Sequence, residues 1–400
     1  MTNTTPLPPV PTRTLRGAGI EQLVNLLQLQ HRHKIDVVVP VTTLAMRNGL
    51  LQFPMLDPVV DAEGVTNVAG QYLRTDTVDQ QLASLFDIPV RYVRTLAAEY
   101  TELLDTNINM WAEKEADRNK PRRVLVRMLY GEDPDAPGTS GLVRAILSDR
   151  YGIRDNLDTV ISVLDGMREG GLGADNIRGA DLTDDRLWLR VHAPELSTHA
   201  GNLARGYRSP FNGKTAEELP LIHAGIVVEN SETGGGALKV TPELIMQVCN
   251  NGMKINTAAM RRVHLGTKLE EGQIAWSADT VDAANELTKH QIKDAVKSFM
   301  TVEFVESTVA KLNEAAGVEV EDPTKTVEVV AKKLSYSDDV AKGILGHFMA
   351  SVAPTEEGLK YTAGHVMHAV TSYAQVIDNV DKANEVGATG VEAMLIAAGR

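Results

Sequence analysis

Basic and aromatic residues lie close together at several points in the middle of the chain. Arg150, Tyr151 and Arg154 fall in one short segment, and Trp188 and Arg190 alternate within RLWLRVHA. Proteins that bind single-stranded DNA without sequence preference need cations for the phosphates and aromatic faces for the bases. The other basic residues that fit this role are Arg205, Arg208, Lys254, Arg261 and Arg262. We therefore expect a DNA-binding groove if these side chains converge, above all Arg150, Arg154 and Arg190.

The overall charge does not by itself favour a polyanionic partner. The chain has 40 Lys and Arg against 53 Asp and Glu, a formal net charge of −13. The acidic excess lies mainly in residues 270–400, which have 11 basic and 21 acidic residues. Residues 118–154 carry eight basic and four acidic residues, so the chain average hides a cationic stretch. Each basic cluster is also compatible with a solvated surface whose Tyr or Trp lies in the core.

The sequence lacks the residue patterns of the common catalytic sites. FNGKT resembles the end of a phosphate-binding loop, but Arg208 stands where that loop needs its first glycine. The single cysteine, Cys249, cannot form an internal disulfide or a cysteine zinc cluster. His365 and His368 share a helix face but lack the carboxylate spacing of a helical zinc site. We expect a non-catalytic protein without a metal or a cofactor.

A metal-dependent hydrolase or nuclease is one alternative. It would use His192, His223 and a nearby carboxylate such as Glu229. A protein without nucleic-acid binding, which interacts with other proteins through its helical C-terminal third, is another.

Residues 78–107 contain two consecutive helical patterns with the spacing of a helix-turn-helix. A capping box over Thr77–Gln80 is expected to open the first helix, and Pro89 to begin the second. Arg91 and Arg94 would lie on the second helix, where helix-turn-helix proteins contact bases. An ordinary helix pair in a core has the same pattern, so binding to duplex DNA is a further alternative.

The hydrophobic periodicity predicts an α+β protein. We expect a central antiparallel or mixed sheet packed with helices, flanked by an N-terminal helical segment and a helical C-terminal third. Residues 1–16, rich in Thr and Pro, are expected to form a disordered tail. The predicted units that follow are an N-terminal α+β segment with the helix pair (17–120), a strand-rich core (121–268) and an acidic helical region (269–400).

Strand and helix boundaries follow from the same patterns. RRVLVRML, RLWLRVHA and LIHAGIVVEN read as strands, and alternation places Trp188, Arg190 and His192 on one face of theirs. Three helices are expected to start at Asp155 or Asn156, at Asp322–Pro323 and at Ser337–Asp338.

The chain has no apolar run near the roughly twenty residues of a membrane span. TNTTPLPPVPT, close to its start, lacks the basic and apolar parts of a secretory signal. Together with the single cysteine, these features favour a soluble protein of the host-cell cytoplasm.

Four motifs carry a more specific signal. They are Ser148–Asn156 (SDRYGIRDN), Val227–Ala237 (VVENSETGGGA), Val248–Met253 (VCNNGM) and His368–Ala374 (HAVTSYA). In this order they resemble the signatures of the phage- and plasmid-borne family catalogued as domain of unknown function 932. The resemblance covers roughly residues 120–375, and His368 replaces the Asn that is usual in the last motif. It implies a bacteriophage or mobile-element protein and no particular reaction.

The family resembles, in layout, the single-strand annealing proteins of the RecT and Erf kind. This resemblance implies a sheet backed by helices, self-assembly into a homo-oligomer and a basic groove that holds DNA. The leading hypothesis is therefore a non-catalytic DNA-handling protein that binds or anneals single strands in recombination. Its acidic C-terminal region would bind a phage or host protein, or compete with DNA for the basic surface.

Overall fold

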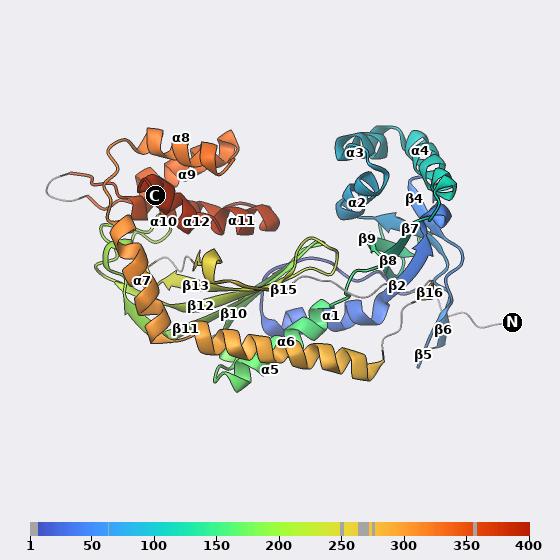
Figure 1. Cartoon of the computed structure of the whole chain (residues 1–400), viewed down its shortest axis with the longest axis horizontal. Coiled ribbons are helices and arrows are strands. Elements are labelled where there is room, and N and C mark those ends of the chain that lie inside the picture. The colour runs from blue at the N-terminus through green and yellow to red at the C-terminus, as the bar shows by residue number, and fades with distance from the viewer. Residues whose placement is uncertain (1–6, 63, 249–251, 263–271, 274–276, 355–357) are drawn as a thin grey trace.

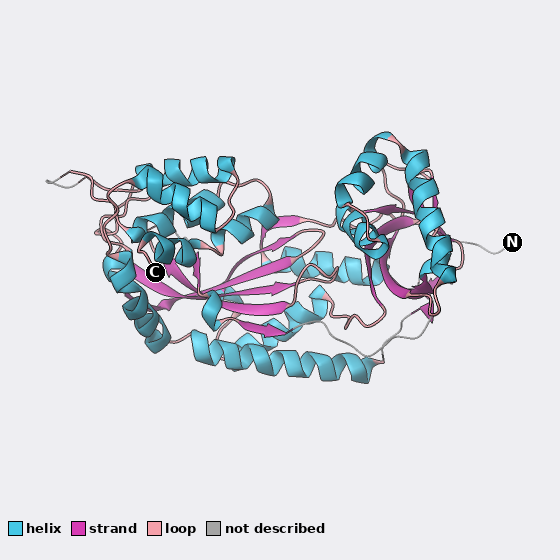
Figure 2. Ribbon diagram, turned by 45° about the horizontal axis from the view of Figure 1, so that its top comes forward, coloured by secondary structure: helices cyan, strands magenta, loops and turns pink. Residues whose placement is uncertain are grey.

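The α+β prediction is confirmed, but the chain is built on two large sheets instead of one. A computed structural model describes residues 7–62, 64–248, 252–262, 272–273, 277–354 and 358–400. The larger sheet forms one lobe with most of the helices, and the smaller sheet forms a second lobe beside it (Figure 1). A ribbon coloured by secondary structure shows the same two-lobed arrangement from a second direction (Figure 2).

The larger sheet is antiparallel throughout its described strands. Its order is β1-β10-β11-β12-β13-β14, and β15 also pairs with β13. The strands are β1 (Leu15–Ala18), β10 (Ile177–Leu182), β11 (Leu187–His199), β12 (Leu221–Asn230), β13 (Leu238–Met246), β14 (Gly252–Lys254) and β15 (Met260–Arg262). In the centre of the sheet, each of the strands β10 to β13 pairs with the next strand along the chain.

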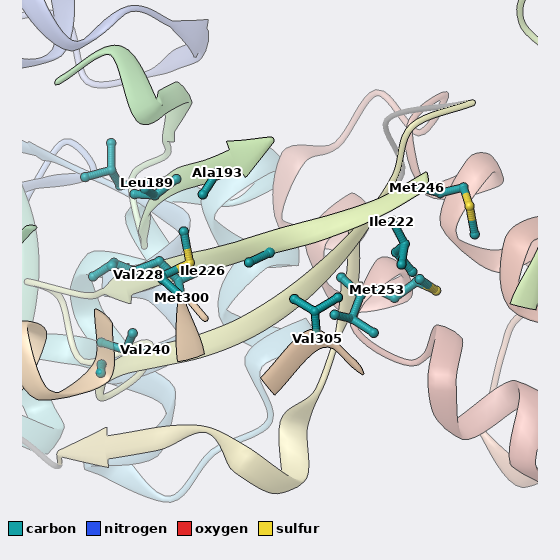
Figure 3. Packing of buried hydrophobic residues seen from close by; sticks show 14 of the residues in the cluster. Leu189, Ala193, Ile222, Ile226, Val228, Val240, Met246, Met253, Met300 and Val305 are labelled. Atoms are coloured by element: carbon teal, nitrogen blue, oxygen red, sulfur yellow. The ribbon is translucent and has the colours of Figure 1, made fainter. Parts of the chain in front are cut away.

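One face of the larger sheet is apolar because alternate residues of each strand are apolar. Leu189, Ile226 and Val240 belong to the largest core cluster, together with Met300, which follows one of the covering helices, and Val305, which lies in another (Figure 3). The helices that cover this face are α1 (Ile20–His33), α5 (Asn156–Glu169), α6 (Ala278–Phe299) and α7 (Val302–Ala316). The predicted alternation in RLWLRVHA is confirmed, because only its Leu, Val and Ala residues join this cluster.

The smaller sheet is mixed, in the order β16-β2-β8-β9-β7-β4-β3, and only β7 and β9 pair in parallel among its described strands. Its strands are β16 (Gly272–Gln273), β2 (Lys34–Pro40), β8 (Arg123–Tyr130), β9 (Gly141–Ser148), β7 (Gly70–Arg74), β4 (Leu50–Phe53) and β3 (Met46–Arg47). A separate hairpin joins β5 (Val59–Asp61) to β6 (Gly64–Thr66). The helices α2 (Asp76–Phe86), α3 (Val90–Glu99) and α4 (Thr101–Lys114) cover one face.

The expected boundary between residues 120 and 121 does not separate two sheets. β8 and β9, from the predicted core, pair with β2 and β7, from the predicted N-terminal segment. That segment is also richer in strands than expected, since β2 to β7 all belong to it. Non-local strand pairing of this kind leaves no local sequence signal.

The observed helix starts agree with the predicted ones in three cases and differ in the predicted helix pair. Asp155, Asp322 and Ser337 take the N-cap positions of α5, α8 (Pro323–Lys333) and α9 (Asp338–Ala350), as expected. Of the three, Asp322 caps with its side chain, which accepts from the Lys325 amide. The first helix of the pair starts slightly earlier than predicted, because the side chain of Thr75 caps it by accepting from the Val78 amide. The expected second helix is two helices, α3 and α4, which meet at a non-helical residue.

The C-terminal third is helical, as predicted, and it is part of the folded core. It adds α8 (Pro323–Lys333), α9 (Asp338–Ala350), α10 (Ala363–Ala374), α11 (Val380–Gly387) and α12 (Gly390–Ala397). These five helices share a hydrophobic cluster, and Met367 and Met394 also reach the core of the larger sheet. The region is therefore not a separable arm.

Part of the expected N-terminal tail is held against the smaller lobe. The Val10 amide donates to the Glu132 carbonyl at 3.0 Å, and the Glu132 amide donates to the Pro8 carbonyl at 2.8 Å. Gln30 Nε2 donates to the Thr12 carbonyl at 2.8 Å. These bonds hold the segment that leads into β1, so the prediction of a disordered tail is wrong from Pro8 onwards.

A buried cluster of charges joins the two lobes. Arg127, on β8, is 2% exposed and lies opposite Asp36 of β2 in the strand register. Its guanidinium donates to both oxygens of Asp36, at 2.8 and 3.1 Å, and to Oδ1 of Asp155 at 2.6 Å. A further bond, of 2.9 Å, reaches the Glu232 carbonyl in the hairpin between β12 and β13. One side chain thus ties the smaller sheet, the start of α5 and the larger sheet together.

The carboxylates of this cluster are matched by further donors. Glu232 accepts from the Arg144 guanidinium and from the Asn156 amide, and Lys34 donates to Asp155. Burial alone would raise the pKa of Asp155, but the charges of Arg127 and Lys34 outweigh it and hold that pKa well below its usual range. The cluster is therefore a fully ionic joint inside the protein.

Replacing Arg127 with Met should be strongly destabilising. It leaves Asp36 and the Glu232 carbonyl buried without the donor and Asp155 with Lys34 alone, a loss of about 3–5 kcal/mol when one partner of a buried pair is removed. Urea unfolding at about pH 7 measures the loss. The matched control is Arg168→Met, whose exposed pair with Asp165 contributes within about 0.5 kcal/mol. Equal losses for the two variants would contradict the role assigned to Arg127.

Candidate nucleic-acid interface

The second face of the larger sheet is polar and carries charges from most of its strands. The side chains that alternate with the core residues include Asp181, Arg190, Glu229, Lys239 and Glu243. α10, α11 and α12 lie on this side, opposite α5 and α6 (Figure 1). Two cavities occupy the space over the strands, and we name them the hairpin cavity and the helix-covered cavity.

The hairpin cavity lies beside the Gly-rich turn between β12 and β13 and has a volume of about 270 Å³. Its charged lining consists of Arg186, Glu229, Lys239 and Arg261. Lys239 and Arg261 are direct cross-strand partners, an arrangement of like charges that is unfavourable without an anion nearby. Neither forms a salt bridge with any described residue. Glu229 is the other cross-strand neighbour of Lys239, but its described salt bridge is with Nζ of Lys254 at 3.0 Å. Nζ of Lys239 donates instead to the amide oxygen of Asn256 at 3.2 Å.

The helix-covered cavity lies between β10–β14 and the helices α10 and α11, and has a volume of about 390 Å³. Arg16, Arg178, Arg190 and Lys254 all line it. Arg190 is fixed by Asp181 Oδ2 at 2.7 Å and by the amide oxygen of Asn384 at 2.9 Å. Lys254 is buried, and its bond to Glu229 forms the wall shared with the hairpin cavity.

Glu243 is the least usual residue of this cavity. Its side chain is 4% exposed, and none of the described residues donates a hydrogen bond to its carboxyl group. Burial raises its pKa, while the charges of Lys254 and Arg190 act in the opposite direction. A Cβ on Gly252 would lie 2.9 Å from Oε2, so the glycine makes room for the carboxyl.

A third cavity, of about 730 Å³, opens between α2 and α11. It contains Arg16, Arg94 and Arg186, but its carboxylates outnumber them. Those are Asp76, Asp184, Asp185, Asp381 and Glu385. The charge balance of this cavity is therefore acidic and unfavourable for a polyanion.

The predicted site residues separate into two groups. Arg190, Lys254 and Arg261 are brought to the polar face, as a groove on the sheet requires. Trp188 lies on the same strand face as Arg190 but is 1% exposed, so its ring cannot stack on a base. Arg262 follows in β15, opposite Leu238.

The segment after β9 lies elsewhere, and the predicted groove through Arg150, Arg154 and Arg190 is wrong. Arg154 is buried and donates to the Thr288 hydroxyl on α6, on the apolar side of the sheet. Tyr151 packs beneath the smaller sheet and donates to the Ser231 carbonyl at 2.9 Å, and burial raises its pKa. Arg150 lines a different groove.

The basic-aromatic-basic order in the 205–208 loop is not a stacking platform. Arg205 and Arg208 are exposed, but Tyr207 between them is fully buried, with its ring 4.0 Å from that of His368. The Arg208 amide pairs with the Ser351 carbonyl, which places the loop against the C-terminal helices. Both arginines therefore lie away from the two cavities.

Several charged residues of the site were missed from the sequence. Arg16, Arg178, Arg186, Lys239 and Glu243 come from strands and a hairpin turn that are far apart in the chain. One available signal was the alternation Lys239, Thr241, Glu243 along β13, which has the same period as RLWLRVHA. The register that brings these residues beside Arg190 could not be read from that pattern.

The positions of His192, His223 and Glu229 do not favour the alternative of a metal-dependent enzyme. His192 and His223 lie with ring centroids 5.7 Å apart, but Glu229 is held by Lys254. In the part of the chain that the structure describes, no cluster of three His, Cys, Asp or Glu could hold a metal ion. Burial lowers the pKa of His192 to about 4, so its imidazole is neutral near pH 7. Cys249 lies outside the described residues.

The predicted helix pair exists, and Arg91 and Arg94 are exposed on α3. Val78 and Leu82 of α2, together with Val93 and Leu96 of α3, also cover the core of the smaller sheet. Binding to duplex DNA stays a prediction.

The signature motifs meet in two places. SDRYGIRDN and VVENSETGGGA contact each other at the buried joint, where Asn230 Nδ2 donates to Asn156 Oδ1 at 2.8 Å. Gly252 of the third motif and Thr371 of the fourth both line the helix-covered cavity. The usual Asn of the fourth motif is replaced by His368, which is buried and bonds to the Leu203 carbonyl at 2.6 Å.

Comparisons of the chain with protein-family models, with curated proteins and with solved structures find no match. The family resemblance therefore stays a prediction from the motifs. None of the described helices combines the length and the apolar character that crossing a membrane requires.

The buried histidines should make folding sensitive to acid. Burial lowers the pKa of His368 to about 3 and of His365 to about 4. An unfolded histidine gains its proton near pH ~6.5, so stability is present above that pH and is lost as the pH falls toward the folded pKa. Each such residue should cost about 2 kcal/mol between pH ~6.5 and pH ~5.

Urea unfolding of the His368→Asn variant at several pH values measures this effect. The variant should show a flatter decline of stability between pH ~6.5 and pH ~5, by about 2 kcal/mol. His290→Asn, at an exposed position on α6, should decline as the unmodified protein does. A His368→Asn profile parallel to that of the unmodified protein would show that this histidine is not held neutral.

Proposed function

We propose that the chain is a non-catalytic DNA-handling protein that holds single-stranded DNA by its phosphates over the polar face of the larger sheet. The observation that carries the proposal is the cross-strand pair Lys239 and Arg261, two cations in one cavity that form no salt bridge with a described residue. Arg178, at the rim of the neighbouring cavity, also forms no salt bridge with a described residue. A polyanion supplies the missing negative charge for all three.

The wall between the cavities supports a continuous site. Lys254 lines the helix-covered cavity and Glu229 lines the hairpin cavity, and the 3.0 Å bond between them joins the two. Adjacent phosphates of one strand can therefore lie along both. Since the aromatic residue of this face, Trp188, is buried, the proposed binding rests on charge, and it should depend little on sequence.

The family resemblance suggests the biological context in which the proposed DNA binding would take place. It implies a homo-oligomer that acts in recombination of phage or mobile-element DNA in the host cytoplasm. Light scattering of the protein with and without oligonucleotide tests the assembly.

A protein-interaction role without DNA is the second candidate, and one observation favours it. The predicted arginines scatter over several faces, and Arg190 and Lys254 are paired with acids. Under this candidate the acidic C-terminal helices bind a phage or host protein.

Replacing both Lys239 and Arg261 with Ala should weaken binding of a labelled single-stranded oligonucleotide. The log of the affinity should fall less steeply with the log of the salt concentration, by about 0.7 for each phosphate that the variant no longer neutralises. Fluorescence anisotropy over a range of salt concentrations measures both quantities. A matched control is the double replacement of Lys325 and Lys332 with Ala, two exposed lysines of α8 that should change neither.

Two results would overturn the proposal. One is the absence of binding by the unmodified protein at micromolar concentration and low salt, which would favour the protein-interaction role. The other is an equal effect of the two double variants, which would place any DNA away from the hairpin cavity.

A further inference from the structure

The helix-covered cavity contains a polar group that the phosphate site does not use. Glu243 is buried at its floor, and among the described residues no donor satisfies its carboxyl. A carboxyl that no described residue bonds and that borders a cavity takes its hydrogen bonds from what fills the cavity, water or a ligand. The cavity volume of about 390 Å³ lies within the range of small-ligand sites.

The charged groups around Glu243 come from the strands. The charges of Arg190, Lys254 and Glu229 act on it. Arg16, Arg178 and the titratable His192 also line the cavity. Burial lowers the pKa of His192 to about 4, so this imidazole stays neutral across the neutral range.

Among the described residues that line the cavity, Glu243 is the acid whose carboxyl has no protein donor. α10, its C-cap residue and α11 contribute uncharged polar side chains, which are Thr371, Gln375 and Asn384. Asp181, the second acid among the described lining residues, is held by Arg190 at 2.7 Å. A ligand in this cavity therefore meets the Glu243 carboxyl beside the cations that line the same space.

A carboxyl group in its neutral form presents one O–H donor beside one acceptor. The proton can occupy either oxygen, so the donor and the acceptor can exchange places. Every nucleobase carries an adjacent donor and acceptor on its pairing edge, and a neutral carboxyl can match each of them. Burial, which raises the pKa of Glu243, favours this neutral form.

We propose that the helix-covered cavity receives one unpaired base of a bound nucleotide, whose pairing edge bonds to the Glu243 carboxyl while its phosphate lies on Arg178 at the rim. Arg178 is exposed there and forms no salt bridge with a described residue. This inference rests on the proposed function, since it adds a base pocket beside the phosphate site. It requires a single strand, because a paired base has no free edge.

The test compares two labelled oligonucleotides of equal length, one of ordinary nucleotides and one of abasic units with the same phosphates. The unmodified protein should bind the ordinary strand about tenfold more tightly at pH ~6. Glu243→Leu should bind both strands equally, whereas Glu243→Gln, which keeps a donor and an acceptor, should keep the preference. Glu217→Leu, at an exposed position outside the cavity, is the matched control.

The pH dependence separates hydrogen bonding from a merely structural role. Ionisation of the carboxyl removes its O–H donor, so the preference of the unmodified protein should fall as the pH is raised through the range in which Glu243 ionises. The preference of Glu243→Gln should not change. Should Glu243→Leu fail to fold by thermal melting, Ala383→Leu fills the cavity from α11 and should remove the preference in its place.

Mononucleotides identify the source of the base. Binding of free dAMP or dTMP that Ala383→Leu abolishes supports a pocket for a nucleotide of either source. Equal binding of ordinary and abasic strands by the unmodified protein overturns the base pocket but leaves the phosphate site intact. Binding of neither strand overturns the proposed function, and if mononucleotides also fail to bind, the base pocket falls with it.

Discussion

The arrangement of the two lobes depends on the pairing of Arg127 with the carboxylates around it. A guanidinium that is 2% exposed is tolerated only when each of its charges and donors is matched. Here the partners come from β2, from the N-cap of α5 and from the hairpin between β12 and β13. Because these three elements belong to different layers, the ionic joint fixes how the larger sheet meets the smaller one.

The same hairpin links the joint to the candidate site. Glu232, at its base, is bound within the joint, while the glycines a few residues later border the hairpin cavity. β12 and β13 run from this hairpin across the polar face, and they carry Glu229, Lys239 and Glu243. The position of the charged face therefore follows from the ionic joint at its edge.

The C-terminal helices cover part of this face and enclose the cavity between themselves and the strands. Without α10 and α11 the strands would present a flat charged surface, whereas with them Arg190 and Lys254 line an enclosed volume. Asn384 of α11 bonds directly to Arg190, and Arg16 donates to the Ile377 carbonyl after α10. The acidic residues of α11 lie toward the third cavity, which limits the cationic surface on that side. Access to the proposed site thus depends on how the helical region sits on the sheet.

The sequence by itself determined the local features, because these depend on residues a few positions apart. Alternation along RLWLRVHA placed Leu189 in the core and Arg190 on the polar face, and the cap at Asp322 follows from residue type. The α+β class and the helical C-terminal third follow from the same periodicities. Only the tertiary structure decided that Arg154 and Trp188 are buried and that Lys239 lies opposite Arg261, because strand register and layer packing join distant segments. The sequence does not distinguish a charged side chain that faces water from one that faces a buried carboxylate or a cavity. Its environment is set by the neighbours that the fold brings to it across the sheet.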